Sequence, residues 1–290
     1  QFSWDESARR ALEAMEAVHA AHGVPPVHDS SGRKPRLAYV SPLPPERTGI
    51  ADYGAELLPE LTRHYEIEVV SDQAEIGACV PLGCQWRSSE WFDRHAAHYD
   101  RVLYQVGNSS FHGHMFDLLS RHPGTAVLHD FYLGHISAHV AASGSDSGFW
   151  TRALYESHGY RALLAQCDGA APGEVARKYP SNWNVLRDSD GVIVHSGFCK
   201  RLAASWYGEA ATARMLHIPL LRSKRNPCSR EEARRALGIS DAGFVVASFG
   251  VVNPPKLCDR LVSAWGLSRL AKAHGGLLVF VGDSHDNAFT

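Results

Sequence analysis

From Arg36 onward, short apolar runs alternate with stretches that have helical spacing, and this alternation limits the fold more than any other feature. Strands that alternate with helices are typical of a parallel sheet whose two faces are covered by helices. The sequence therefore predicts an α/β fold with a Rossmann-like parallel sheet. The expected strands are Leu37–Ser41, Ile67–Ser71, Val102–Val106, Ala126–Leu128, Gly191–His195 and Met215–Leu220, and the expected helices lie near 50–63, 113–121 and 198–206.

The stretch 221–229 is basic, contains a proline and predicts a domain boundary. Residues 132–180 before it break the rhythm with several short helical pieces, an insertion of the kind that contributes to a ligand pocket. Two further strands follow the boundary, and two strands cannot form a covered parallel sheet. We therefore expect the second Rossmann-like domain to be incomplete at Thr290. Its expected elements are helix 230–237, strand 244–249, a helix near 256–272 and strand 277–281.

The N-terminal stretch 3–18 has apolar residues at helical spacing and a capping box formed by Ser3 and Glu6. A linker rich in small residues, Pro and Gly extends from there to Pro35. We expect this helix to lie outside the fold that begins at Arg36. A simple N-terminal appendage remains an alternative to a remnant of another module.

The composition is that of a globular chain. Its 290 residues are 44% hydrophobic, and 29 Lys+Arg against 31 Asp+Glu give a net charge of −2. No broad positive field follows from this balance, so we expect no nucleic-acid partner. No apolar run is long enough to span a bilayer, and the N-terminus lacks the layout of a signal peptide. The sequence thus predicts a cytoplasmic protein, with the basic cluster 222–225 either a solvated linker or a contact to a phosphate or a lipid surface.

The cysteines and histidines do not predict a metal site. The six cysteines are irregularly spaced without a CxxC pair, so neither a zinc site nor a disulfide framework is indicated. His135 and His139 have the i, i+4 spacing that could hold a metal, but no HExxH motif accompanies them. We expect scattered structural and surface histidines instead.

The loop between the first strand and the first helix is rich in proline and ends at Gly49. Such a loop brings backbone N–H groups and a helix N-terminus up to a phosphate or a sugar, and Gly49 leaves space for the ligand. An ordinary strand-to-helix turn is the alternative. Because GxGxxG is missing, a nicotinamide-dependent oxidoreductase is a weaker option, although Asp72 lies close to where such enzymes place an acidic ribose ligand.

Five segments along the chain form an ordered set. They are Ser41 to Tyr53, Tyr104 to His112, Val127 to Tyr132, Asp190 to Ser196, and Phe244 to Gly250 with Lys256. Together and in this order they resemble glycosyltransferase family 4. The resemblance implies the GT-B architecture, in which two Rossmann-like domains face each other across a cleft. Residues 36–222 would then form the acceptor domain and 223–290 the start of the nucleotide-sugar domain, while residues 1–35 would be the last helix of an upstream module and its linker.

His129 follows a predicted strand at the edge where open α/β sheets bind ligands. A lone histidine there is more often structural, but the resemblance implies a catalytic role in which its ring donates a hydrogen bond to a sugar hydroxyl. The resemblance also implies acceptor contacts from Asp52, Tyr53, Asn108, His112 and Asp130. For Asp130 the alternative is that it caps the following helix. His195-Ser196, at the end of another predicted strand, could likewise form a strand-end cap beside the cleft.

Transfer from a nucleotide sugar places negative charge on the departing phosphate, which needs a cation or N–H dipoles. Lys256 starts a predicted helix after the loop that begins at Gly250, so the resemblance implies that Gly49, Gly250 and Lys256 bind the donor. A solvated helix-start lysine is the alternative. The family usually has an arginine directly after this glycine, and Val251 in its place leaves reduced or absent activity open.

These observations together predict a retaining, metal-independent, bacterial glycosyltransferase that moves a sugar from a nucleotide-diphosphate sugar to a glycan or lipid-linked acceptor in cell-surface polysaccharide biosynthesis. No cofactor is expected beyond the nucleotide sugar as co-substrate. We expect these 290 residues alone to be inactive, to belong with further domains, and to contact the inner face of the membrane peripherally. The alternative is a non-catalytic sugar-nucleotide or glycan-binding module of a multidomain protein.

Overall fold

The structure is a computed structural model that describes residues 9, 13, 33–76, 81, 83–144, 146–220, 228–241, 243–252, 256–272 and 276–282. The chain forms two compact units, Gln1–Ser223 and Lys224–Thr290, and each is described by itself. The expected helix 3–18 lies outside the described residues apart from Arg9 and Glu13, which are helical and form an ion pair one turn apart.

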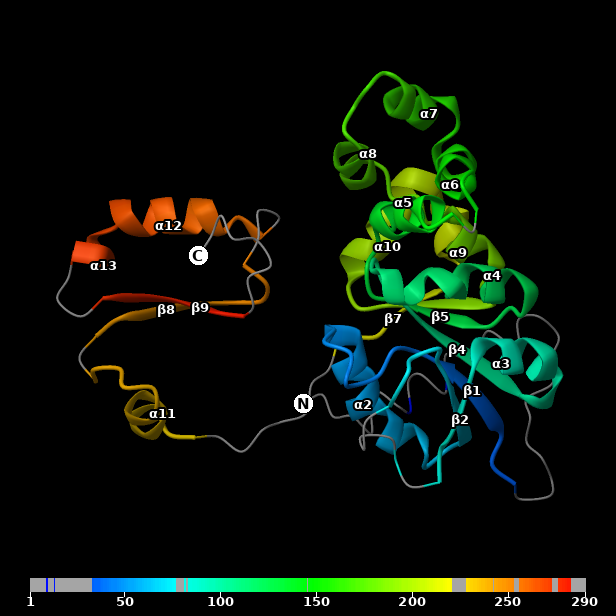
Figure 1. The fold of residues 1–290 in the computed structure, drawn as a ribbon, viewed down its shortest axis with the longest axis horizontal. Helices are drawn as coiled ribbons and strands as arrows, with labels where there is room; N and C mark the ends of the chain where they lie inside the picture. Colours follow the sequence, from blue (N-terminus) through cyan, green and yellow to red (C-terminus); the bar gives the residue numbers. More distant parts are fainter. Residues whose placement is uncertain are drawn as a thin grey trace. The chain divides into compact units, whose positions relative to one another are not determined.

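The larger unit contains a sheet of seven parallel strands in the order β3-β2-β1-β4-β5-β6-β7 (Figure 1). This confirms the predicted α/β class and the Rossmann-like sheet. The strand order reverses between β1 and β4, and in open parallel sheets ligands bind outside the carboxyl ends of the strands at such a point. The strands are β1 (Arg36–Val40), β2 (Glu66–Val70), β3 (Gln85–Arg87), β4 (Arg101–Val106), β5 (Thr125–Leu128), β6 (Gly191–Val194) and β7 (Met215–His217).

Helices cover both faces of this sheet. One core cluster joins strand residues such as Tyr104 and Leu128 to the helices that follow β3, β4, β5 and β6, and a second joins Tyr39, Val127 and Ile193 to α2. The helices of the larger unit are α2 (Gly49–Leu61), α3 (Ser89–His95), α4 (Gly113–Arg121), α5 (Gly134–Ala142), α6 (Phe149–His158), α7 (Tyr160–Cys167), α8 (Pro172–Lys178), α9 (Trp183–Asp188) and α10 (Gly197–Tyr207).

Successive strand residues face opposite sides of a sheet, so residues two apart share a side. Leu103 and Val127 lie in the core cluster beneath α2, whereas Tyr104 and Leu128 lie in the other cluster. The row beneath α2 therefore continues along β4 to Gln105. The polar end of this row lies at the carboxyl edge of the sheet.

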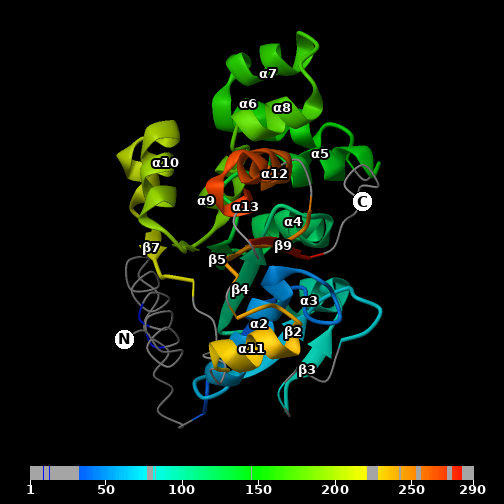
Figure 2. The same cartoon turned by 90° about the vertical axis from the view of Figure 1, so that its left-hand side faces the viewer.

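Several elements of this unit were not predicted, among them α9. The three-residue edge strand β3 and the helix α3 precede β4, and Phe92 of α3 is fully buried in the core. The insertion 132–180 forms α5 to α8, and α6, α7 and α8 lie at the end of the larger unit remote from β2 (Figures 1 and 2). These three helices have their own small core around Trp150, Leu154 and Tyr179.

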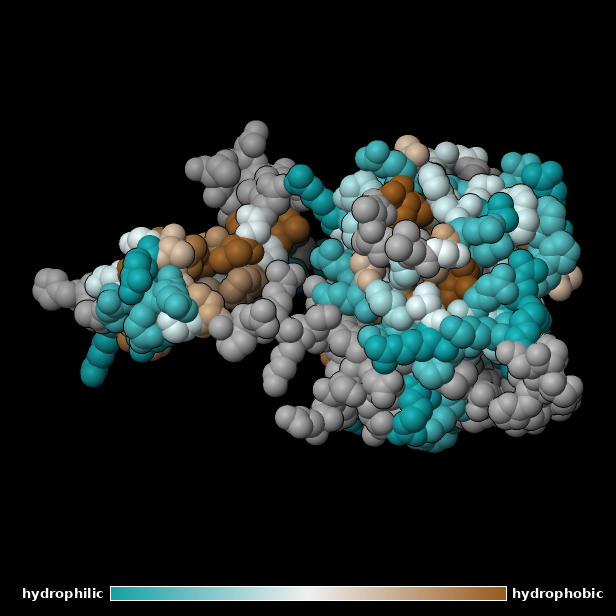
Figure 3. Space-filling view, turned by 90° about the horizontal axis from the view of Figure 1, so that it is seen from below, coloured by the Kyte–Doolittle hydropathy of each residue, from teal (hydrophilic) through white to brown (hydrophobic). Residues whose placement is uncertain are grey.

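The smaller unit has two parallel strands, β8 (Val245–Phe249) and β9 (Leu277–Val281). Its helices are α11 (Arg230–Ala236), α12 (Cys258–Leu267) and α13 (Arg269–Lys272). The expected helix 256–272 is thus divided at Ser268, whose backbone is extended. Large apolar side chains remain at the surface of this unit, and Figure 3 shows brown areas over it. Leu237, Phe249 and Leu267 are among them, at 72%, 75% and 85% exposed.

Candidate functional site

The loop from β1 to α2 is held in place by the side chain of Gln73. Its Oε1 accepts a hydrogen bond from the backbone N–H of Leu43 at 2.8 Å, and its Nε2 donates to the carbonyl of the same residue at 2.7 Å. Thr48 then caps α2, because its Oγ1 accepts from the N–H of Ala51 at 3.0 Å. The loop therefore presents the start of α2 in a fixed position at the edge of the sheet.

The start of α2 keeps hydrogen-bonding capacity for a ligand. The first N–H groups of a helix have no partner within the helix, and no hydrogen bond in the described residues uses those of Gly49 or Ile50. Gly49 is exposed, and a Cβ built there would meet nothing within 4 Å. Asp52 in the same turn is exposed as well. This end of α2 suits an anion or a sugar hydroxyl, although the donor and acceptor roles of these residues stay predictions.

Three aromatic rings meet below α2 at the carboxyl ends of β5 and β6. The ring of Tyr53 is 5.1 Å from that of His129 and 5.5 Å from that of His195, and the two imidazoles are 4.8 Å apart, measured between centroids. Gln105 joins them from β4, with its Oε1 2.7 Å from His129 Nε2. We call these four residues the imidazole cluster.

Each imidazole has one nitrogen engaged and one left over. His195 Nδ1 lies 2.9 Å from the carbonyl of Ile218, which only accepts, so Nδ1 carries the proton and Nε2 is an acceptor. His129 Nε2 faces Gln105 Oε1, which by the same reasoning makes Nδ1 its acceptor. The sequence led us to expect a donor at His129, and its role toward a ligand stays a prediction.

Burial keeps these imidazoles neutral. Desolvation, followed by the neighbouring His195 and His112, lowers the pKa of His129 to about 3. Burial likewise lowers the pKa of His195, and it raises the pKa of Tyr53 to about 12. At neutral pH the cluster therefore carries no charge and offers two imidazole acceptors.

Several buried polar atoms around the cluster lack a hydrogen-bond partner. They include Gln105 Nε2, His195 Nε2, the hydroxyl of Tyr39 and both ring nitrogens of His112. Nearly all buried polar groups in proteins are hydrogen-bonded to protein or to water. A group of such atoms at one edge of the sheet indicates a place where a polar ligand or ordered water completes the bonding.

The predicted contacts Asn108 and Asp130 have structural tasks in the fold. Asn108 Oδ1 accepts from the N–H of Ile136 at 3.0 Å and so caps α5, while Asp130 Oδ2 accepts from the N–H of Asn108 at 2.9 Å. The alternative that Asp130 caps the following helix is therefore wrong, because Asn108 does so. Ser196 caps α10 by accepting from the N–H of Cys199, as expected for the end of β6.

His112 is nearly fully buried beside these residues and packs against Gly107. A Cβ at Gly107 would lie 2.9 Å from His112 Nε2 and 2.3 Å from Ile50 Cδ1, so this position has no space for a side chain. Burial lowers the pKa of His112 to about 4. The structure thus brings His112 to the same edge as His129, and its acceptor role stays a prediction.

The carboxylate of Asp72 is hydrogen-bonded within the fold. Its two oxygens accept from the backbone N–H and the hydroxyl of Ser89, at the start of α3. An acidic residue near the end of β2 binds the ribose hydroxyls of NAD in dinucleotide-binding folds. These two hydrogen bonds give Asp72 a structural task in the fold, and they add no support to the oxidoreductase alternative.

In the smaller unit, Gly250 and Lys256 lie close together. Gly250 has φ +117°, a conformation that favours glycine, and a Cβ there would lie 3.8 Å from Lys256 Cε. Lys256 is exposed and precedes α12. Their donor role stays a prediction.

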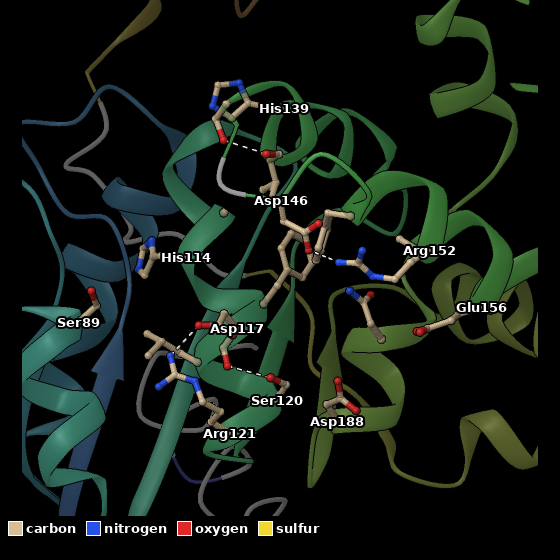
Figure 4. Close-up of a pocket in the computed structure, with 18 of the residues that line it drawn as sticks. Ser89, His114, Asp117, Ser120, Arg121, His139, Asp146, Arg152, Glu156 and Asp188 are labelled. Carbon is tan, nitrogen blue, oxygen red and sulfur yellow. Dashed lines mark hydrogen bonds and ion pairs between the residues drawn. The ribbon is translucent and has the colours of Figure 1, made fainter.

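A cavity of about 850 Å³ lies on the opposite side of the sheet, among α4, α5, α6 and α9 (Figure 4). Asp117 and Arg121 pair along α4, while Arg152 pairs with Asp146 and faces them from α6. No member of the imidazole cluster lines this cavity. Because its arginines pair with carboxylates, it shows less unused hydrogen-bonding capacity than the edge beneath α2.

Among the residues that the structure describes, no group of three or more His, Cys, Asp or Glu side chains could hold a metal ion. The described cysteines, Cys84, Cys167, Cys199, Cys228 and Cys258, are free. None of the described helices is long and apolar enough to cross a membrane.

Sequence reasoning missed Gln73 and Gln105. For Gln105 a signal was present, since a glutamine within the apolar run Val102–Val106 must be buried and therefore needs a partner. Gln73 lies in a loop, and no pattern in the sequence links it to Leu43, thirty residues away.

No protein-family model and no curated protein matches the sequence. A similar solved structure is described as an alpha-glucosyltransferase in complex with UDP-glucose and DNA containing an abasic site. The alignment covers 88% of this chain and 69% of that chain, with a TM-score of 0.41 and 11% identity. At this level the likeness adds nothing to the assignment of a function, and the α/β class rests on the observed strand order.

Proposed function

We propose that this chain belongs to a retaining, metal-independent glycosyltransferase of the GT-B type, which transfers a sugar from a nucleotide-diphosphate sugar to a glycan or lipid-linked acceptor. The single observation that supports this most is the imidazole cluster. It places neutral hydrogen-bonding groups with unused capacity beside the capped start of α2, at the carboxyl edge of a Rossmann-like sheet. The reaction type in this proposal rests on the ordered resemblance to glycosyltransferase family 4.

The chemistry of the cluster suits a polyhydroxylated ligand. A sugar hydroxyl both donates and accepts. His129 Nδ1 offers the acceptor and the N–H groups of Gly49 and Ile50 offer the donors, whereas His195 Nε2 and the amide nitrogen of Gln105 are buried. Because the cluster is uncharged, it offers no cation for the leaving phosphate. In our proposal Lys256 supplies this cation, and Gly250, whose own N–H is bonded to Val281, leaves space for the donor beside it. Gly49 belongs to the proposed donor-binding residues through its N–H at the start of α2.

The wider proposal is cell-surface polysaccharide biosynthesis in a bacterial cytoplasm, with peripheral membrane contact. The free cysteines in the described residues fit a reducing compartment, because disulfides persist mainly in oxidising ones. The acceptor is a glycan or a lipid-linked glycan that reaches the edge formed by Tyr53 and His112.

The experiment is a transfer assay on the natural gene product that contains these 290 residues. Release of nucleoside diphosphate is followed with a panel of nucleotide sugars, for the wild type and for two variants. We expect His129→Ala to lower the transfer rate about ten- to a thousandfold, since one hydrogen bond that favours the transition state is lost. Lys256→Ala should weaken donor binding and turnover together.

The matched control is His135→Ala, which removes an exposed histidine of α5. It should leave the rate at the wild-type level, and circular dichroism should show an unchanged fold for all three variants. Wild-type rates in both His129→Ala and Lys256→Ala would refute the enzyme assignment. If transfer is absent and His129→Ala only weakens glycan binding, the protein is a non-catalytic binding module, as Val251 in place of the family's arginine would favour.

A further inference from the structure

We propose that Gln105 is a positioning residue, which holds His129 in the Nε2–H tautomer and thereby turns the Nδ1 lone pair of this histidine toward a ligand hydroxyl. The purpose of this arrangement rests on the function proposed above, whereas the tautomer itself is a property of the protein alone. Gln105 touches no reacting atom in this scheme and acts through His129.

The position of Gln105 supports this role. It lies near the end of the central strand β4 and is fully buried. Its partner in register is Val127 of β5, and His129 follows the end of β5, two residues after Val127. A buried amide is costly unless it is hydrogen-bonded. Its Oε1 meets this need at 2.7 Å from His129 Nε2, but its Nε2 has no partner.

The direction of the hydrogen bond fixes the histidine. An amide oxygen only accepts, so the nitrogen that faces it must carry the proton, and the second nitrogen of a neutral imidazole is then an acceptor. His129 Nδ1 makes no hydrogen bond in the described residues, and it is not among the buried unpartnered atoms. It is therefore both unoccupied and reachable.

An amide turned by 180° would reverse this result. Gln105 Nε2 would then donate to His129 Nε2, Nδ1 would carry the proton, and the ring would donate to the ligand. His195 provides an internal reference, because its Nδ1 faces a backbone carbonyl that cannot be turned over in this way. Its Nδ1–H tautomer is independent of the orientation of Gln105.

None of the other groups named here that face His129 selects its tautomer, so Gln105 determines it. His195 and His112 are neutral neighbours, Tyr53 packs against the ring from α2, and the adjacent Asp130 is bonded to the backbone of Asn108. Among these residues, Gln105 alone contacts a ring nitrogen of His129 at hydrogen-bonding distance.

The test is long-range ¹⁵N–¹H correlation NMR on the 290-residue chain with labelled histidine at pH 7. The signals of His129 are assigned by their loss in His129→Ala. We expect a single tautomer with the proton on Nε2 in the wild type. In Gln105→Met, which keeps the volume and removes the acceptor, the preference should fall about fivefold, the ratio that one net hydrogen bond of ordinary strength gives.

A second variant keeps the acceptor and adds charge. In Gln105→Glu the His129 ring should remain Nε2–H and its pKa should rise, because an adjacent carboxylate favours the imidazolium. His195 should remain Nδ1–H in every variant. The proposal is overturned if wild-type His129 is Nδ1–H or an even mixture, or if Gln105→Met leaves its preference unchanged.

This outcome can be separated from that of the proposed function. If the tautomer is as stated but no nucleotide sugar is used, the positioning by Gln105 stands and the transferase assignment fails. If transfer depends on His129 but the tautomer is reversed, the transferase assignment stands and His129 acts as a donor instead.

Discussion

The substitution Gly107→Ala tests how tightly the start of α2 is packed against the candidate site. The added Cβ would lie 2.3 Å from Ile50 Cδ1 and 2.9 Å from His112 Nε2. Nonbonded carbon atoms prefer about 3.5–4.0 Å, so Ile50 has to move by more than 1 Å. Ile50 is half-buried and its terminal carbon can turn aside, but the His112 ring is 1% exposed and has no free direction.

Overpacking of this kind costs about 1–3 kcal/mol in the free energy of unfolding. For a domain of 150–250 residues this corresponds to a fall in Tm of about 2–12 °C. The measurement is urea and thermal unfolding of the 290-residue chain, followed by circular dichroism and tryptophan fluorescence.

Gly49→Ala is the matched control, because its Cβ meets nothing within 4 Å and lies at the start of a helix. It should leave the stability unchanged or raise it by up to about 1 kcal/mol. If Gly107→Ala remained within about 0.5 kcal/mol of the wild type, the range of an ordinary surface substitution, then the contact between Gly107, Ile50 and His112 would not be tight and our account of this edge would be wrong.

Two further perturbations have defined outcomes. Gln73→Ala leaves the N–H and C=O of Leu43 without their side-chain partner and should lower the free energy of unfolding in urea by about 1–3 kcal/mol. The control Gln166→Ala, at a half-exposed position, should cost little. Equal effects would contradict the role of Gln73 in holding the loop from β1 to α2. The free energy of unfolding should also fall from pH 7 to pH 4. The pKa values of His112 (about 4) and His129 (about 3) lie below the pKa of about 6.5 that a histidine has in the unfolded chain. The unfolded state therefore takes up protons first as the pH falls. The slope should be shallower in His112→Asn, and an identical slope would show that this ring is not buried in its neutral form.

The periodicity of the sequence predicted the sheet because parallel strands are buried on both faces and stand out as apolar runs. All six predicted strands of the larger unit are present. The edge strand β3 was missed because Gln85, Trp86 and Arg87 form no such run, and Trp86 is 42% exposed. β3 is a strand because it pairs with β2, which ends at Val70. A pairing between segments this far apart in the sequence leaves no local pattern.

The candidate site was predicted only as separate strand ends. His129 and His195 each follow a strand, and parallel neighbours bring their carboxyl ends together, so their proximity follows from the order β5-β6. The sequence could not give the direction of any hydrogen bond. That His129 Nε2 faces Gln105 Oε1 depends on side-chain geometry across two strands, and this contact is the basis on which we propose an acceptor at Nδ1.

The buried, uncharged character of the imidazole cluster bears on what it can do. Two imidazoles with centroids 4.8 Å apart would repel each other if both were protonated, and burial penalises even one charge. A cluster of this kind is a poor source of protons at neutral pH and a poor site for an anion. It is, however, a good set of fixed, uncharged hydrogen-bond acceptors. The first turn of α2, at the same edge of the sheet, supplies N–H donors. Neutral acceptors beside backbone donors match a hydroxyl-rich ligand attached to a phosphate. We therefore place the sugar at the edge beneath α2 and not in the cavity among α4, α5, α6 and α9.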